Sequence, residues 1–132
     1  METSIYTFDK TLSDTSFDAA VSRTRESLAA KDFGVLTEID VRKTMKAKLD
    51  TDIGDYLILG ACNPQMAFEA LKLEPRVGTM LPCNVIIRQV GDNSVEVSAI
   101  DPVASMTSIE NPDLHDVACK VRDMLKSVID AL

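Results

Sequence analysis

The stretch that decides the fold is Tyr56-Leu57-Ile58-Leu59-Gly60-Ala61-Cys62-Asn63-Pro64. Residues 56–62 are apolar on both faces, a pattern typical of a strand inside a sheet. Asn63 is a favoured N-cap and Pro64 a favoured first helical residue, so the strand leads into a helix that ends near Lys72. We therefore expect a central strand whose last residue, Cys62, directly precedes a helix.

A hairpin is predicted downstream of this unit. Residues 84–90 and 95–100 alternate as strands, and the Gly-Asp-Asn-Ser segment between them has the chemistry of a tight turn. The register has two alternatives. A simple turn places Arg88 opposite Val97, whereas a one-residue bulge brings Arg88 towards Glu96.

The N-terminal part of the chain is predicted to form a strand and a helix. The strand covers residues 4–9. Thr15, with Asp18 three residues later, resembles a capping box that starts a helix running to Lys31. Gly34 is expected to end this helix, because a glycine just past a helix readily adopts the left-handed conformation.

Residues 35–41 alternate in polarity, which predicts a half-buried strand. One face would carry Val35, Thr37, Ile39 and Val41, and the other Leu36, Glu38 and Asp40. A short basic helix follows over residues 41–49, with Met45 and Leu49 directed inward. We interpret its lysines as a solvated helix face in preference to an anion-binding surface.

The last element is a long amphipathic helix that opens at Asn111-Pro112. Two long helices and four or five strands with hairpin-like links predict an α+β fold, in which both helices pack on one face of a mostly antiparallel sheet. The chain of 132 residues has no linker-like segment, so we expect a single domain over residues 1–132. The apolar stripe of the last helix comprises Leu114, Val117, Ala118, Val121, Met124, Leu125, Val128 and Ile129.

Charge and composition argue against several classes of partner. The 21 acidic and 14 basic residues give a net charge of −7, which would repel nucleic acid. No apolar stretch approaches the roughly 20 residues of a membrane span. The first six residues do not resemble a secretory signal. The expected compartment is therefore the cytoplasm, where the three cysteines would stay reduced.

The densest candidate site combines Cys62 and Asn63 with Cys83 and Asn84. If the two strands that carry the cysteines are antiparallel neighbours, both thiols lie at one end of the sheet; in a parallel unit they would lie at opposite ends. The hairpin-rich pattern favours the antiparallel case. Residues 74–82 are predicted as a long loop, and its part from Pro75 to Pro82 as a lid over the site.

Cys62 is the best candidate for a reactive thiol. A thiol before a helix N-terminus faces unpaired N–H groups and the positive end of the helix dipole, which lower its pKa. The alternative is a small buried residue at a strand end, since free cysteine is among the most buried residue types. We give this structural interpretation somewhat more weight for both Cys62 and Cys83.

His115 and Cys119 lie four residues apart on the last helix, a spacing that can hold two metal ligands. They fall outside the apolar stripe and point to solvent or to a partner. We favour an exposed pair without a role, because a closed zinc site needs four ligands and no second pair is near in sequence. The sequence also lacks a phosphate loop, a dinucleotide fingerprint, a nucleophile elbow and a His-Glu-x-x-His motif.

Four blocks of the sequence resemble the bacterial and archaeal family called domain of unknown function 302. They are residues 33–41 (Phe-Gly-Val-Leu-Thr-Glu-Ile-Asp-Val), 58–64 (Ile-Leu-Gly-Ala-Cys-Asn-Pro), 81–85 (Leu-Pro-Cys-Asn-Val) and 98–102 (Ser-Ala-Ile-Asp-Pro). The resemblance implies a TATA-binding-protein-like fold, with the order strand, helix, four strands, helix, and a homodimer. It also implies that Cys62 and Cys83 share one end of the sheet. The family supplies no activity, so no catalytic residue is carried over.

Three functional hypotheses follow. The first is a dimeric cytoplasmic binding protein in which Cys62 and Cys83 bind a soft metal or perform reversible thiol chemistry, with Asn63, Asn84 and Met80 beside them. Two thiolates and the Met80 thioether would favour monovalent copper over zinc. The second is an interaction module with buried cysteines. The third is an enzyme with Cys62 as nucleophile, for which the sequence shows no base; no cofactor is identified.

Overall fold

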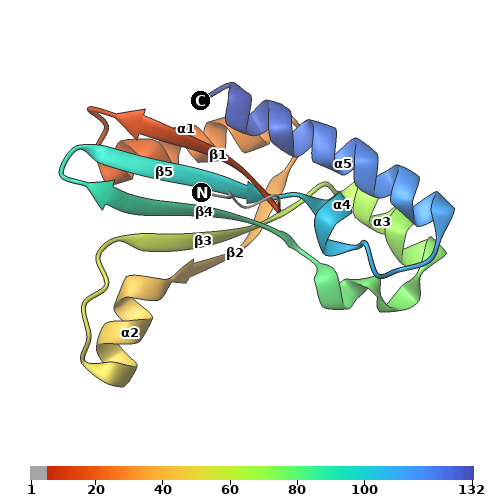
Figure 1. Ribbon diagram of the computed structural model, residues 1–132, viewed down its shortest axis with the longest axis horizontal. Helices are drawn as coiled ribbons and strands as arrows, with labels where there is room; N and C mark the ends of the chain where they lie inside the picture. The colour runs from red at the N-terminus through yellow and green to blue at the C-terminus, as the bar shows by residue number, and fades with distance from the viewer. Residues whose placement is uncertain (1–5) are drawn as a thin grey trace, which may run out of the picture.

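An antiparallel sheet of five strands forms the centre of the computed structural model, which describes residues 6–132 (Figure 1). The strand order across the sheet is β1-β5-β4-β3-β2. The strands are β1 (Thr7–Ser13), β2 (Gly34–Asp40), β3 (Tyr56–Cys62), β4 (Cys83–Gly91) and β5 (Ser94–Ile100). The helices are α1 (Phe17–Ala30), α2 (Val41–Leu49), α3 (Pro64–Leu73), the 3-10 helix η1 (Pro75–Met80), α4 (Pro102–Ser105) and α5 (Pro112–Asp130).

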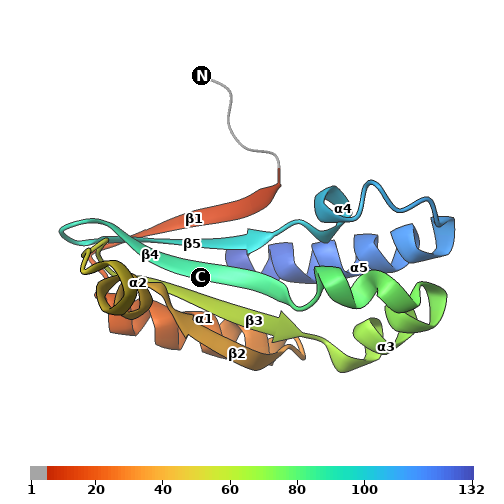
Figure 2. The same ribbon diagram turned by 90° about the horizontal axis from the view of Figure 1, so that it is seen from below.

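The two long helices, α1 and α5, pack on the same face of the sheet, as the sequence predicts (Figure 2). Alternate residues of β3, β4 and β5 point into the core between the sheet and these two helices. Leu59, Ile87 and Val97 are examples and are fully buried. A second apolar cluster forms where α3, η1 and α5 meet beyond the end of the sheet. The α+β class with an antiparallel sheet is thus confirmed; the relation to the TATA-binding-protein-like group stays a prediction.

β3 lies inside the sheet between β2 and β4, over the predicted residues. It ends where Asn63 caps α3: the Asn63 side-chain oxygen accepts a hydrogen bond from the Met66 N–H, and Pro64 occupies the first turn. The deciding stretch of sequence therefore folds as expected, with Cys62 directly before the helix.

The first strand was misplaced by the sequence analysis. β1 covers Thr7–Ser13 because its whole length pairs with β5, from Thr7 opposite Ile100 to Ser13 opposite Ser94. Of the predicted residues before Thr7, Tyr6 is not part of the strand, and residues 4 and 5 lie outside the described residues. The cap of α1 is also one residue later than predicted: Ser16, not Thr15, accepts the hydrogen bond from the Ala19 N–H.

The residue at which the chain leaves α1 also differs from the prediction. Asp32, with φ of 64°, takes the left-handed conformation predicted for Gly34, which instead begins β2. A side-chain oxygen of aspartate can bond locally to the backbone, so aspartate tolerates this conformation better than most residues.

A bulge at Leu36 changes the two faces of β2. Val35 pairs with Ala61, but the next pair is Thr37 with Gly60, so Leu36 is skipped. Glu38 consequently lies on the helix side of the sheet, where it pairs with Arg25 of α1. Its predicted neighbour on that face, Leu36, is instead left exposed. The prediction that Val35 shares a face with Thr37 and Ile39 was therefore wrong. A one-residue slip moves every later side chain of the strand to the opposite face.

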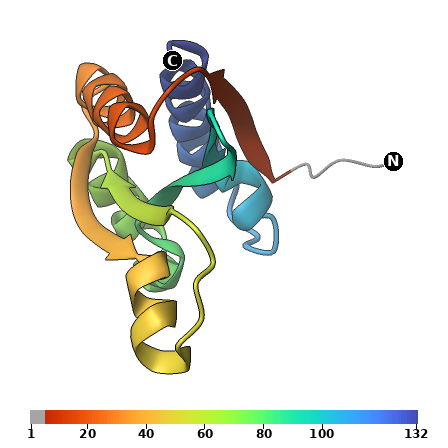
Figure 3. The same cartoon turned by 90° about the vertical axis from the view of Figure 1, so that its left-hand side faces the viewer.

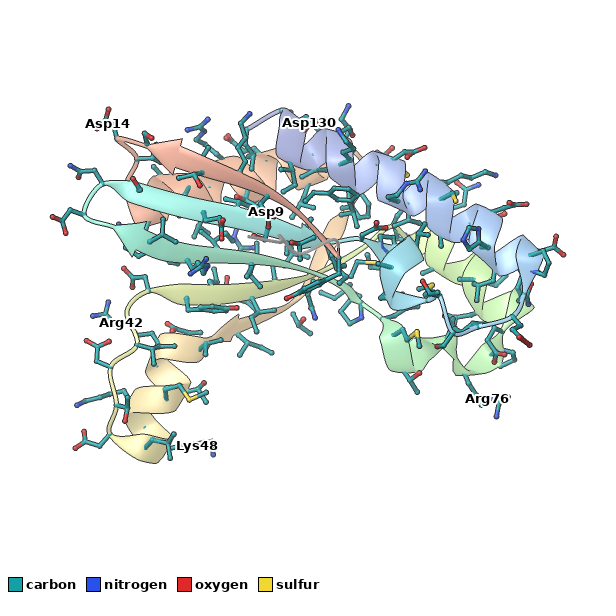
Figure 4. All side chains as sticks on the ribbon, viewed as in Figure 1. Asp9, Asp14, Arg42, Lys48, Arg76 and Asp130 are labelled. Atoms are coloured by element: carbon teal, nitrogen blue, oxygen red, sulfur yellow. The ribbon has the colours of Figure 1, made fainter. Side chains whose placement is uncertain are left out.

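α2 projects away from the sheet, as Figure 3 shows, and none of its residues is buried. Leu49, predicted to point inward, is 67% exposed. Arg42 ties the base of α2 to the segment that leads into β3, through Asp52 and Asp55. Figure 4 shows Arg42 at this base and Lys48 towards the tip, so α2 forms an arm. No helix in residues 6–132 is long and apolar enough to cross a membrane.

The β4–β5 hairpin adopts the bulged register. Gly91 pairs with Ser94, but the register shifts between Gln89 and Gly91. Arg88 therefore lies opposite Glu96, and its Nη2 is 2.8 Å from the Glu96 carboxylate on the open face of the sheet.

Candidate functional site

Cys62 and Cys83 come together at one end of the sheet. β3 and β4 are antiparallel neighbours, and Ala61 pairs with Cys83, so Cys62 is one residue beyond the pair. All three cysteines of the chain are free, Cys83 being buried and Cys62 half-buried. Of the two strand arrangements that the sequence left open, the antiparallel one is therefore correct.

Both cysteines line one narrow cavity between the end of the sheet and helices α3, α4 and α5. The cavity volume is about 30 Å³. A single water needs roughly 10–15 Å³ in this measure, whereas pockets for organic ligands measure about 300–1,000 Å³. The site therefore has room for an ion or one or two waters and none for an organic molecule. Its walls are Phe33, Ala61, Cys62, Asn63, Met66, Ala67, Ala70, Leu81, Cys83, Pro102, Met106, Leu114, Val117, Ala118 and Val121.

The apolar walls keep both thiols protonated at neutral pH. Burial, and then the nearby Cys62, raise the pKa of Cys83 to about 11. Burial also raises the pKa of Cys62. This direction is opposite to the lowering of the Cys62 pKa that the sequence analysis predicted from the end of α3.

The structure separates the other predicted site residues. Asn63 lines the cavity, but its side-chain oxygen is engaged in capping α3. Asn84 and Met80 line a different hollow of about 300 Å³, together with Thr79, Leu81, Pro82, Ile100 and Ser105. Asn84 is exposed and does not line the cavity, whereas Cys83 is buried and does.

The segment predicted as a lid packs against the second apolar cluster. Most of the segment from Pro75 to Pro82 forms η1, in which Val77 is 1% exposed and packs in the second apolar cluster. Of residues 75–82, Leu81 alone lines the cavity, so this segment does not cover it as the predicted lid would.

Sequence analysis missed two sulfur-containing residues, Met66 and Met106, which line the cavity with the cysteines. Met66 could have been predicted from the sequence, because it lies in the first turn of the helix that Cys62 precedes. Met106 gave no signal, because the sequence does not reveal that α4, capped by the Asp101 side chain, turns the chain back towards α5.

His115 and Cys119 lie side by side on α5, with 3.8 Å between Cys119 Sγ and His115 Nδ1. Neither lines the cavity, which α5 meets with its apolar stripe. His115 is exposed, as its place outside that stripe predicts. Within the described part of the chain, no three His, Cys, Asp or Glu side chains are grouped so as to hold a metal ion. Any metal at the cavity would thus depend on the two cysteines and on thioethers.

Known proteins place this architecture in a family. The model of the family "Domain of unknown function DUF302" matches residues 8–132. A crystal structure of an uncharacterized conserved protein DUF302 from Bacillus stearothermophilus aligns with a TM-score of 0.87 and 24% sequence identity. The alignment covers 96% of this chain and 98% of that one, and shows that the two share a fold. No curated protein matches the sequence. With nearly its whole length matched by the family model, the chain belongs to the DUF302 family.

Proposed function

We propose that this protein binds a soft metal ion through the thiolates of Cys62 and Cys83. The observation that carries the proposal is that both cysteines, although they come from different strands, line the same ion-sized cavity. Thiolates are the protein ligands that soft metals prefer.

The raised thiol pKa values are compatible with this role. A metal ion that binds a thiol displaces its proton, so the site would be neutral when empty and charged only when occupied. The same pKa values argue against a nucleophilic enzyme, because the thiolate is the reactive form. None of the residues that line the cavity is a histidine or a carboxylate that could act as base.

The main alternative is a structural role, in which the cysteines merely fill space at the end of the core. Cys83 does belong to the main apolar cluster, which supports this alternative. Cys62, however, is only half-buried and lines the cavity. An accessible thiol next to a buried one favours entry of an ion from the Cys62 side.

A second copy of the chain is the partner we propose for the open face of the sheet. Ile39, Ile58 and Ile86 lie opposite one another on β2, β3 and β4 and form an apolar row across that face. Ile39 is 47% exposed. A row of this kind on a solvated sheet face is typical of an interaction surface. The cytoplasm is the compartment we propose, since the site needs reduced thiols.

Metal binding tests the proposal directly. Protein purified without a histidine tag is incubated under reducing conditions with Ag⁺, a thiophilic probe, and bound metal is measured after gel filtration. We expect about one ion per chain in the wild type and a near-complete loss in Cys62→Ser and Cys83→Ser. Cys119→Ser, which removes the free thiol outside the cavity, is the matched control and should bind like the wild type. Equal binding in all four proteins, or none in the wild type, would overturn the proposal.

A further inference from the structure

We propose that the α2 arm of each chain docks into a hollow at the opposite end of the open sheet face of a second copy, so that two chains clasp each other. The hollow is the one of about 300 Å³ that Met80, Pro82 and Asn84 line. This inference rests on the proposed dimer, and it assigns the orientation of the two chains and a second pair of contacts between them.

The arm and the hollow lie on the same side of the sheet. Figure 3 shows α2 on the opposite side of the sheet from α1 and α5, so the arm projects beyond the open face. Asn84, in the hollow, directly precedes the buried Val85 on β4, and successive strand residues point to opposite faces. The hollow therefore opens on the face that the helices leave uncovered.

The two features occupy opposite ends of that face. α2 leads into β3, so the arm lies at the end of the sheet where β3 begins. β4 runs antiparallel to β3, so its first residues, at the hollow, lie at the other end. The pair of Ile58 and Ile86 is midway between them. Ile58 is two positions from Tyr56 at the arm end, and Ile86 is two positions from Asn84 at the hollow.

Symmetry limits how a second copy can cover this face. Two identical chains pair around a two-fold axis. Two separate sheets that pack face to face keep their strands within about 30° of each other, so the axis runs either along the strands or across them. An axis across the strands, through the isoleucine row, exchanges the two ends of the face. Each arm then lies at the hollow of the other chain, and the two Ile58 side chains meet.

Shape and charge favour the axis across the strands. An axis along the strands would bring both arms to the same end of the dimer. Lys43 and Lys48 of the arm have no ion-pair partner among the described residues, so two neighbouring arms would repel each other. All 21 acidic residues of the chain lie outside α2, so the body of a second copy attracts the arm.

The length and the tip of the arm fit the hollow. The nine residues of α2 rise about 13 Å, and packed sheets lie about 10 Å apart, so the tip of the arm is level with the second sheet. Leu49, the last residue of α2, is 67% exposed, and Ile53 in the next loop is 47% exposed. The hollow is as large as the smaller pockets that hold organic molecules, and its lining residues are uncharged. It therefore has room for the apolar side chains at the tip.

Dimer affinity tests the clasp on the full chain. Dissociation constants are measured by sedimentation equilibrium. We expect Leu49→Asp, at the tip of the arm, and Ser105→Trp, which fills the hollow, each to weaken the dimer by about 10-fold or more. Phe68→Asp is the matched control: Phe68 is 62% exposed on α3, outside the arm and the hollow, and its substitution should leave the dissociation constant unchanged. Circular dichroism should show wild-type melting of the monomers, because all three side chains are exposed.

Thiol cross-linking tests the orientation. Leu49→Cys and Asn84→Cys are prepared in separate chains, each also carrying Cys119→Ser, mixed to allow subunit exchange, and treated with a short bis-maleimide. We expect covalent dimers from the mixture and none from either variant alone, because the arm of one chain faces the hollow of the other. The Cys119→Ser chain without a further change controls for reaction at Cys62 and Cys83.

The outcomes separate this inference from the proposed dimer. Cross-linking of Leu49→Cys chains to one another would place both arms at one end and overturn the clasp. A dimer that Ile58→Asp disrupts, but that Leu49→Asp and Ser105→Trp leave unchanged, would also overturn the clasp and leave the proposed dimer standing. A monomeric wild type would overturn both. Ag⁺ binding by Cys62 and Cys83 is measured independently of all three results.

Discussion

Gly60 of β3 and Pro82, which precedes β4, are in contact where the two strands of the cavity meet. A Cβ atom on Gly60 would lie 2.7 Å from Pro82 Cγ and 2.2 Å from Thr37 Oγ1, so the position has no room for a side chain. This contact joins the strand that ends in Cys62 to the residue before Cys83. Gly60 therefore contributes to the placement of both cysteines although it does not line the cavity.

Substitution of Gly60 should test this contact. We expect Gly60→Ala to lower the free energy of unfolding by about 1–3 kcal/mol, because Pro82 and Thr37 must move to admit the methyl group. Chemical denaturation monitored by circular dichroism measures the change. Gly34→Ala is the control: its Cβ would meet nothing closer than the Cys62 carbonyl at 3.9 Å, so a change within about 0.5 kcal/mol is expected. Equal losses in the two variants would contradict the proposed role of the contact.

The buried Cys83 thiol should make the protein sensitive to alkaline pH. Its pKa rises from an ordinary value of 9.0 to about 11 on folding. The folded state thus favours the protonated thiol. The resulting stabilisation is complete below pH 9 and is lost as the pH rises towards 11. Two pKa units correspond to roughly 2–3 kcal/mol.

Denaturation curves at several pH values between 8 and 11 measure this loss. Lysines and tyrosines titrate in the same range, so the informative quantity is the difference between the wild type and Cys83→Ala. We expect the wild type to lose more stability than the variant over this interval. Parallel curves for the two proteins would show that the Cys83 thiol is not held protonated by the fold.

The sequence predicted those parts of the fold whose signals are local. The apolar run of residues 56–62, the Asn63-Pro64 and Asn111-Pro112 helix starts and the stripe of α5 each appear in the structure as expected. Errors occurred where pairing with another strand decides the outcome. The bulges near Leu36 and Val90 follow from strand register, and the alternating pattern of a single strand contains no record of them.

The candidate site was predictable only in part for the same reason. Proximity of Cys62 and Cys83 followed from the assumption of antiparallel neighbours, which is correct. Which methionines line the same cavity depends on how α3 and α4 pack beyond the end of the sheet, a contact between distant parts of the chain. Asn84 and Met80 are close to Cys83 in sequence, yet they face a different hollow.

Ion pairs at the base of the α2 arm should show in the titration of Asp52. Hydrogen bonding to Arg42 lowers the pKa of Asp52 to about 2, although the carboxylate is at the surface. This interaction is present above pH 4 and is lost as the pH falls towards 2. Carboxyl-carbon NMR titration should give a midpoint near 2 in the wild type. In Arg42→Gln it should return towards the ordinary 3.8, whereas Lys43→Gln, on the same helix, should leave it unchanged. Unchanged midpoints in both variants would mean that Arg42 does not hold the arm.

The isoleucine row should decide the oligomeric state. If a second copy covers Ile39, Ile58 and Ile86, light scattering coupled to gel filtration should give twice the chain mass of 14.4 kDa. Ile58→Asp places a charge in the middle of the row and should yield monomers, because a buried unpaired carboxylate is costly in an apolar interface. The main core should tolerate this change, since Ile58 is only half-buried and lies outside the core cluster.

Leu36→Asp is the matched control for that experiment. Leu36 is 65% exposed on the neighbouring strand but sits in the bulge and is not part of the row. We expect this variant to keep the mass of the wild type. A monomeric wild type, or loss of the dimer in Leu36→Asp with retention in Ile58→Asp, would show that the open face is not the dimer interface. Because the cavity that Cys62 and Cys83 line lies at the end of the sheet beside α3 and α5, the Ile58→Asp monomer should still bind Ag⁺ through these cysteines.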